Sequence, residues 1–206
     1  MIMQMIMQMK ITLKLNIYIY IYMSLLDQIY KVSCYDKDFK NKTIFVNNIG
    51  SPIYGEITQE GTNSLINYFK EHFNENAIFY DLGCGLGKMV FHIGLLDIKK
   101  SVGIEYSKER YNGCKYIQTN YCPTNKNIEF YNKSFLEHDF SDATIIYIDN
   151  TCFNETVNME IYNKIPKGCL FIFKRIITGV IENVKFEQNL VKRTYNQRQI
   201  NWLIKE

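Results

Sequence analysis

The chain lacks the features that mark secreted, metal-binding or strongly basic proteins. Its six cysteines contain no C-x-x-C pair and its three histidines are scattered, so their spacing indicates no metal site. Cysteines without a disulfide-like or metal-like pattern are typical of the reduced thiols of an intracellular protein. The formal net charge is only +3 over 206 residues, which disfavours a protein that binds nucleic acid mainly through charge.

No apolar run approaches the ~18 to 20 residues that a membrane span needs. Lys10, Lys14 and Asn16 interrupt the most apolar stretch, and no small-residue cleavage site follows it, so neither a signal peptide nor stable membrane association is expected. Residues 1–22 are still unusual, because they repeat Met, Ile and Gln and then alternate Ile and Tyr. We expect a doubtful or disordered leader, with Met23 as the true start, although Ile–Tyr alternation also suits an exposed strand.

The most informative segment is 78–88, which reads Ile-Phe-Tyr-Asp-Leu-Gly-Cys-Gly-Leu-Gly-Lys. An apolar run ends at Asp81 and breaks into glycines at alternate positions, and a second short apolar run ends at Glu105. This order predicts a strand, a tight turn on which a ligand approaches bare backbone, a helix, and an acid that binds ribose. The sequence therefore predicts a nucleoside-binding site, whose glycines are Gly83, Gly85 and Gly87.

The glycine spacing narrows the kind of nucleoside ligand. A dinucleotide fingerprint, G-x-G-x-x-G, would place its third glycine where this chain has Lys88. The observed form, D-x-G-x-G-x-G, is the one used by Rossmann-like enzymes that bind S-adenosylmethionine (SAM). The alternative is a tight turn with no ligand, but the leading Asp81 and the spacing to Glu105 favour SAM.

Beyond residue 76, apolar runs and helical patterns alternate, which predicts an α/β fold with a mainly parallel, doubly wound sheet. Two strand-like stretches in the tail, 184–190 and 202–205, are expected to form an antiparallel edge. We expect one domain, with N-terminal helices and a cofactor-covering loop over 23–76 and the Rossmann-like core over 77–206. The expected core elements are strands 77–82, 101–105, 128–132, 144–149 and 168–175 and helices 87–97, 107–120 and 154–164.

Polar residues at the expected strand ends are the next candidates. Asp149 and Asn150 end a strand that should lie beside the strand of Asp81, so their loop would open next to the methyl group of SAM. The alternative is a helix cap before residue 154, and both roles are compatible. After the preceding strand, Ser134 and Phe135 are placed to bind and cover the adenine, although Phe135 also suits the core.

The segment before the first sheet strand contains Tyr54, Gly55, Glu56 and Thr58. Polar side chains around a glycine form a loop able to cover the methionine end of SAM. Thr58 is also a suitable N-cap for a helix that runs to about residue 73.

Taken together, these motifs resemble the non-SET histone lysine methyltransferases of the disruptor-of-telomeric-silencing type. The resemblance spans residues 53–176 and rests on the Tyr54-Gly-Glu-Ile-Thr segment, the glycine loop, Gly103-Ile-Glu105, Ser134-Phe-Leu and Ile148-Asp-Asn-Thr-Cys-Phe153. The chain departs from the family pattern at three positions. Ser134 replaces an acid, Lys88 a neutral polar residue and Asp149 an asparagine.

The resemblance implies a SAM-dependent protein-lysine N-methyltransferase that acts on histone H3 or the nucleosome, without a metal, in the nucleus or cytoplasm. In the implied mechanism a lysine amine loses its proton and attacks the methyl group of SAM. Asp149 and Asn150 would orient this amine, with Asp149 also in reach of SAM, and Tyr54 and Phe153 would wall the lysine channel. Residues implied in cofactor binding are Tyr54, Glu56, Thr58, Asp81, Gly83, Gly85, Gly87, Glu105, Ser134, Phe135 and Asp149.

Three other functions remain open at this stage. Methyltransferases of nucleobase amines place Asp or Asn, two prolines and an aromatic at this strand end, whereas here Asp149 and Phe153 occur without either proline. A small-molecule methyltransferase is compatible with the same core. The third is a non-catalytic protein that binds SAM.

Overall fold

The computed structural model describes residues 2–32, 55–180, 185–191 and 198–206. Its strands are β1 (Ile78–Leu82), β2 (Lys100–Ile104), β3 (Ile128–Tyr131), β4 (Ile145–Ile148), β5 (Leu170–Phe173), β6 (Lys185–Val191) and β7 (Arg198–Ile204). Its α-helices are α1 (Ile2–Lys31), α2 (Gln59–Tyr68), α3 (Lys88–Gly94), α4 (Lys108–Tyr121) and α5 (Glu155–Lys164). Short 3₁₀ turns are η2 (Lys70–His72), η3 (Phe135–Glu137) and η4 (Asn150–Cys152).

The strands form one seven-stranded sheet in the order β3-β2-β1-β4-β5-β7-β6. Neighbours from β3 to β5 pair in parallel, and β7 pairs antiparallel with both β5 and β6. The predicted α/β class, the mainly parallel sheet and its antiparallel edge are therefore confirmed. β7 begins at Arg198, four residues before the expected strand, because pairing with β6 extends it.

Side chains of each central strand alternate between two cores, one on each face of the sheet. In β1, Phe79 enters the first core, whereas Ile78 and Tyr80 enter the second. The alternation follows from the strand period of two, and burial on both faces explains the unbroken apolar sequence of the parallel strands. β4, which reads Ile-Ile-Tyr-Ile, is buried along its full length.

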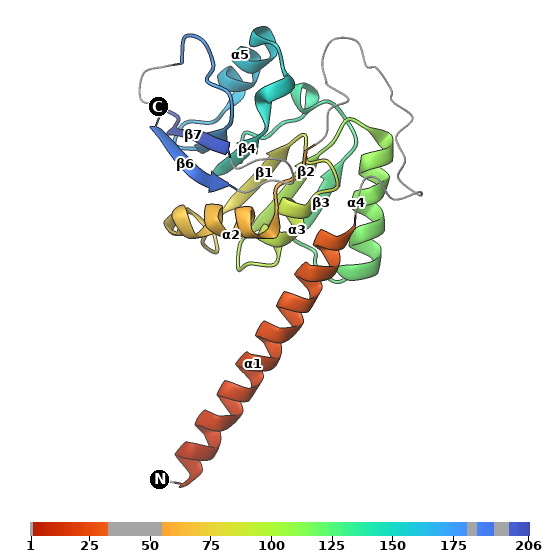
Figure 1. Ribbon diagram of the computed structural model, residues 1–206, viewed down its shortest axis with the longest axis vertical. Coiled ribbons are helices and arrows are strands. Elements are labelled where there is room, and N and C mark those ends of the chain that lie inside the picture. The colour runs from red at the N-terminus through yellow and green to blue at the C-terminus, as the bar shows by residue number, and fades with distance from the viewer. Residues whose placement is uncertain (1, 33–54, 181–184, 192–197) are drawn as a thin grey trace.

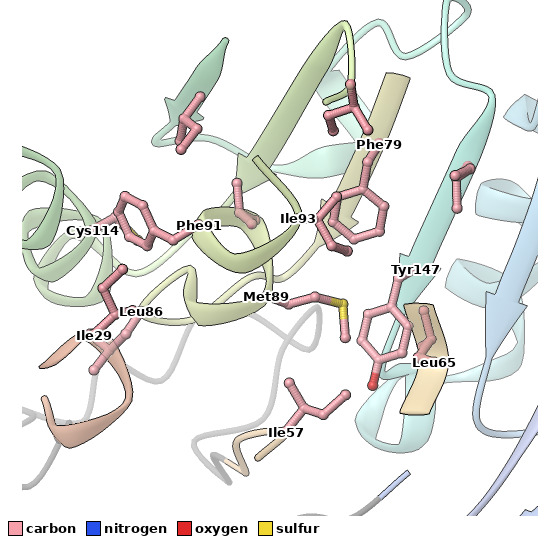
Figure 2. Close-up of a cluster of buried hydrophobic side chains, with 14 of the residues drawn as sticks. Ile29, Ile57, Leu65, Phe79, Leu86, Met89, Phe91, Ile93, Cys114 and Tyr147 are labelled. Carbon is pink, nitrogen blue, oxygen red and sulfur yellow. The ribbon is translucent and has the colours of Figure 1, made fainter. Parts of the chain in front are cut away.

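The first core lies between the sheet and helices α2, α3 and α4. Figure 2 shows Phe79 of β1 and Tyr147 of β4 facing Met89 and Ile93 of α3, with Leu65 of α2 close to Tyr147. Helix α5 packs on the second core through Val157 and related residues. Burying each large apolar side chain contributes roughly 1.5–3 kcal/mol to the stability of the fold. The two cores, one on each face of the sheet, therefore hold the strands and their carboxyl ends in place.

Helix α1 projects from the body of the molecule (Figure 1). It is continuous from Ile2 to Lys31, whereas a helix was expected only from Met23, so the strand interpretation of the Ile–Tyr alternation is wrong. The segment contains no glycine or proline to interrupt a helix. Its large side chains from Ile11 to Ile21 are exposed, and none of the helices within the described ranges is sufficiently long and apolar to traverse a bilayer.

The last turns of α1 are anchored on α3 and α2. Leu26 and Ile29 are fully buried, and the Tyr30 hydroxyl donates to Thr62 Oγ1 at 2.8 Å. The same hydroxyl lies 3.1 Å from Nδ1 of the fully buried His92. Burial lowers the pKa of His92 to about 4, so the ring is neutral in the folded protein near pH 7.

His92 should make the stability of the protein decrease as the pH is lowered. The unfolded chain takes up a proton at His92 near pH 6.5, whereas the folded chain does so only near pH 4. The contribution of neutral His92 to the free energy of unfolding is therefore complete above about pH 6.5 and is lost as the pH falls towards 4. Roughly 2 kcal/mol of it should be lost between pH 7.5 and 5. Urea unfolding at both pH values measures it.

His92→Gln should remove most of this pH dependence, and His138, whose pKa burial also lowers, would supply part of the remainder. The matched control is His72→Gln, because His72 is exposed in the folded chain. An unchanged slope in His92→Gln would contradict the prediction.

Candidate functional site

The loop between β1 and α3 holds the three predicted glycines. All have positive φ, with 87° at Gly83, 61° at Gly85 and 72° at Gly87. The amides of Gly83 and Cys84 donate to the carbonyl oxygen of Ile104 at 2.8 and 3.1 Å. The loop therefore folds back on the end of β2 before α3 begins.

Gly87 is required for two independent reasons. Its φ of 72° lies in the left-handed region, which other residues adopt at a cost of roughly 1–2 kcal/mol. A Cβ at this position would also lie 2.4 Å from Cε1 of Phe130 in β3. Close packing of the loop on β3 thus depends on the absence of a side chain at Gly87.

Glu105 follows β2 and is built into the glycine loop. Its Oε2 accepts a hydrogen bond from the Gly85 amide at 2.9 Å, and its Oε1 accepts one from the Ser107 amide at 2.7 Å. Arg110 Nη1 lies 4.0 Å from Oε1. Burial raises the pKa of this carboxyl, while Arg110 and the backbone amides of Ser107, Gly85 and Tyr106 act in the opposite direction.

A carboxylate has about four acceptor positions, so these contacts leave capacity for hydroxyl donors of a ribose. Asp81, at the end of β1, is also buried, and its register partner in β2 is Gly103. Asp81, Glu105 and the glycine loop therefore meet at one edge of the sheet, as predicted.

Glu56 and Lys88 form a buried ion pair beside this loop. Lys88 Nζ lies 2.6 Å from Glu56 Oε2, and the two side chains are 7% and 13% exposed. The same ammonium donates to the carbonyl oxygen of Tyr30 at 3.2 Å. Lys88 therefore ties the segment before α2 and the end of α1 to the first residue of α3.

The neighbouring predicted residues have different outcomes. Thr58 is the N-cap of α2, since its Oγ1 accepts a hydrogen bond from the Gly61 amide at 3.0 Å, which confirms the capping role. Its predicted contact with a cofactor stays a prediction. Tyr54 lies outside the described residues.

Ser134 caps the 3₁₀ turn η3, which begins at Phe135 after β3. Ser134 Oγ accepts a hydrogen bond from the Leu136 amide at 3.2 Å, and Lys164 of α5 donates to the carbonyl oxygens of Leu136 and His138. The Phe135 ring packs edge-on against Phe153, with centroids 5.2 Å apart. The expected adenine side and the expected lysine channel therefore share one aromatic contact.

Asn150, at the end of β4, is fully buried and makes four hydrogen bonds within the protein. Its Oδ1 accepts from the amides of Lys174 and Arg175 at 3.0 and 2.7 Å. Its Nδ2 donates to the Arg175 carbonyl oxygen at 2.8 Å and to Asn158 Oδ1 at 3.1 Å. These bonds join the ends of β4 and β5, so Asn150 fixes the backbone at this part of the site.

Asp149 differs from its neighbour because it is only half-buried. Its Oδ1 accepts hydrogen bonds from the Thr151 hydroxyl at 2.6 Å and the Thr151 amide at 3.4 Å. Asp149 is thereby the N-cap of η4, the turn that follows β4. Phe153 comes directly after this turn, and its carbonyl oxygen accepts a hydrogen bond from Arg175 Nη1 at 3.1 Å.

The structure brings most predicted residues to the carboxyl ends of β2, β1 and β4, which are neighbours in the sheet. Sequence reasoning missed the Glu56–Lys88 pair and the partners of Asn150. Lys88 offered a signal, because a cation directly after the third glycine requires a nearby counter-charge. Across the described ranges, no three side chains of His, Cys, Asp or Glu converge in a way that would hold a metal ion.

Substituting Gly87 should test the packing of this loop. Gly87→Ala should destabilise the protein by about 2–5 kcal/mol, because left-handed strain adds to the overlap with Phe130. Gly168→Ala is a matched control, since Gly168 has a φ of 78° but open space around its Cβ position. It should cost only about 1–2 kcal/mol by urea unfolding, and equal losses would contradict the packing argument.

Comparison with known proteins identifies relatives of this chain. The model of the family described as "Histone methylation protein DOT1" matches residues 30–189. A protein of Dictyostelium discoideum named "Histone-lysine N-methyltransferase, H3 lysine-79 specific" is 28% identical over 105 residues, covering 44% of this chain. The matched region spans only 6% of the length of that relative.

Solved structures share the fold at low identity. An RNA methyltransferase from Salinibacter ruber, in complex with S-adenosyl-L-homocysteine, has a TM-score of 0.58 and 15% identity, covering 73% of this chain and 94% of that one. A putative methyltransferase, YhhF, from Escherichia coli has a TM-score of 0.57 and 12% identity, covering 77% and 91%. These likenesses confirm the Rossmann-like fold alone. Because the family model covers most of the sequence, the chain belongs to the DOT1 family of histone methylation proteins.

Proposed function

We propose that this chain is a SAM-dependent methyltransferase that modifies a lysine side chain of histone H3. The observation that carries the proposal is the placement of two features on neighbouring parallel strands. The glycine loop bonded to Glu105 lies at the ends of β1 and β2, and the half-buried Asp149 lies at the end of β4. Membership of the DOT1 family supports lysine as the acceptor.

The residues present suit SAM, which carries a ribose diol, an adenine and a charged amino-acid end. Glu105 is a buried acceptor for the diol, held in place by two backbone amides. Ser134 and Phe135 are assigned to the adenine. Glu56 is assigned to the amino group of the methionine end, close to the glycine loop because Lys88 holds its carboxylate there.

When bound, SAM supplies an electrophilic methyl group. The chain must then deliver a neutral amine, although a lysine has a pKa of about 10.4 in water. Asp149 is assigned to orient this amine and to accept its proton. Phe153, packed on Phe135, lines the approach and favours the neutral amine by excluding water. Tyr54 is proposed, on sequence alone, to wall the same channel.

Asn150 supports this arrangement as a positioning residue. Its amide joins the end of β4 to residues 174 and 175 and thereby fixes the backbone that carries Asp149. A side chain with four internal hydrogen bonds is poorly suited to bind a substrate amine as well. The amine contact is therefore assigned to Asp149.

A histone acceptor implies that the protein works in the nucleus, on histone H3 or on the nucleosome. The Dictyostelium relative is named as specific for lysine 79 of H3, which supports H3 as the substrate. Within the chain, residues 23–76 are proposed to contribute the cofactor-covering loop and 77–206 the methyltransferase core.

Labelled SAM tests the proposal directly. The full chain is incubated with SAM labelled in the methyl group and with separate pools of nucleosomes, free histones, other proteins, RNA and DNA. We expect label in H3 from the histone or nucleosome pool, recovered as methyl-lysine after hydrolysis. Label in nucleic acid, or in none of the pools despite measurable binding of S-adenosylhomocysteine, would contradict it.

Substitution of Asp149 tests its role. Asp149→Ala should reduce the turnover number by about 100-fold or more, because the group that orients the amine and takes its proton is lost. The affinity for S-adenosylhomocysteine should stay within about threefold, a change below 1 kcal/mol. Single-turnover transfer and calorimetric binding measure the two effects.

Two further variants serve as controls for Asp149. Asp97→Ala removes an exposed carboxylate away from the site and should change neither quantity. Asn150→Ala should instead lower the unfolding free energy by roughly 2–4 kcal/mol, because buried amides lose their acceptor. Undiminished turnover in Asp149→Ala would refute the assigned role.

A further inference from the structure

Two free thiols lie against the glycine loop. Cys84 stands between Gly83 and Gly85 within the loop, and Cys114 lies in α4. The Cys114 thiol donates to the Gly85 carbonyl oxygen at 3.1 Å, and the Cys84 sulfur lies 4.0 Å from the same oxygen. Interaction with the Cys114 thiol is also one of the causes that raise the pKa of Cys84.

The two sulfur atoms face the same space between the loop, β2 and α4. A Cβ at Gly103 of β2 would lie 2.7 Å from Cys84 Sγ, and a Cβ at Gly87 would lie 3.3 Å from Cys114 Sγ. Figure 2 shows Cys114 in the first core, close to Phe91. The absence of side chains at these glycines leaves room for both thiols.

We propose that Cys84 and Cys114 form a reversible disulfide that prevents cofactor binding, which makes the pair a redox modification site. Cys84 is the more exposed residue of the pair, so we assign it as the thiol that an oxidant reaches first. Cys114 is fully buried next to it and acts as the resolving thiol. The inference rests on the proposed function only in taking the glycine loop as the SAM site.

The reaction with a peroxide as oxidant balances in two steps. Cys84 attacks one oxygen of hydrogen peroxide, which forms a sulfenic acid and releases water. The Cys114 sulfur then attacks the Cys84 sulfur, the S–O bond breaks, and a second water leaves. Two thiols are oxidised to one disulfide while one peroxide is reduced to two waters.

The disulfide would change the loop where the cofactor is proposed to lie. Gly83 and Gly85, which flank Cys84, have positive φ angles, and glycine adopts such conformations without strain. The cross-link removes the thiol hydrogen bond to the Gly85 carbonyl oxygen. The Gly85 amide also donates to Glu105, so displacement of Gly85 disturbs the assigned ribose acceptor.

The environment of Cys84 predicts how fast its thiol is oxidised. Burial, the contact with Cys114 and the nearby carboxylates raise the pKa of the Cys84 thiol. Because the thiolate is the nucleophile, oxidation should be slow at pH 7 and faster at higher pH. This sets it apart from rapid, indiscriminate oxidation of an exposed thiol.

The test uses the full chain with Cys152→Ser, which removes an exposed thiol. The protein is treated with hydrogen peroxide, digested without reduction and mapped by mass spectrometry. We expect a Cys84–Cys114 cross-linked peptide with the loss of two hydrogens. The affinity for S-adenosylhomocysteine should fall about tenfold or more by calorimetry and recover with dithiothreitol.

Three variants separate this pair from the other thiols. Cys114→Ser keeps a hydroxyl donor for Gly85 but cannot form the cross-link, so its affinity should not show the recoverable loss. Cys84→Ser should behave in the same way, whereas Cys122→Ser, which removes a buried thiol elsewhere, should still cross-link.

Oxidation of Cys84 to sulfenic or sulfinic acid without a cross-link would overturn the proposal, as would a cross-linked protein with unchanged affinity. Absence of S-adenosylhomocysteine binding by the reduced chain would also overturn it. Failure to methylate a histone is a separate result. A chain that transfers no methyl group but shows the cross-link and the recoverable loss of affinity would refute the proposed function and support this one.

Discussion

The hydrogen bond from the Gly85 amide to the Glu105 carboxylate is the contact on which the site depends. It joins the tip of the glycine loop to the end of β2, and the Ser107 amide holds the other oxygen of the same carboxylate. A buried carboxylate is unfavourable without such donors, so Glu105 and the loop stabilise each other. The acid that suits a ribose is therefore also the acid that shapes the loop, and the two roles cannot be changed separately.

The two adjacent polar residues at the end of β4, Asp149 and Asn150, have different roles. Asn150 is fully buried and bonded to the segment after β5 and to Asn158, whereas Asp149 is half-buried and takes part in a local turn with Thr151. A strand end gives successive side chains opposite directions, one towards the protein interior and one towards the opening of the site. Rigidity and access are thus supplied by neighbouring residues.

The sheet, the glycine loop and Glu105 were predictable because their signals are local: apolar runs, glycine spacing and an acid at the next strand end. The Glu56–Lys88 pair was not, since it joins residues from separate segments, and only the fold shows that they meet. The four bonds of Asn150 likewise depend on where β5 ends. The length of α1 was missed because residues 1–22 were interpreted as a doubtful or disordered leader, with a strand as the alternative. A segment without glycine or proline is equally compatible with a helix.

The placement of β7 has a consequence for how the protein is made. β6 precedes β7 in the chain but lies outside it, and β7 pairs with both β5 and β6. A ribosome therefore releases β6 before the strand that connects it to the sheet. Until β7 inserts, the backbone groups of β6 lack this partner, which is the condition that exposes a nascent strand to wrong pairing. Pairing of β6 with the sheet must therefore follow synthesis of β7.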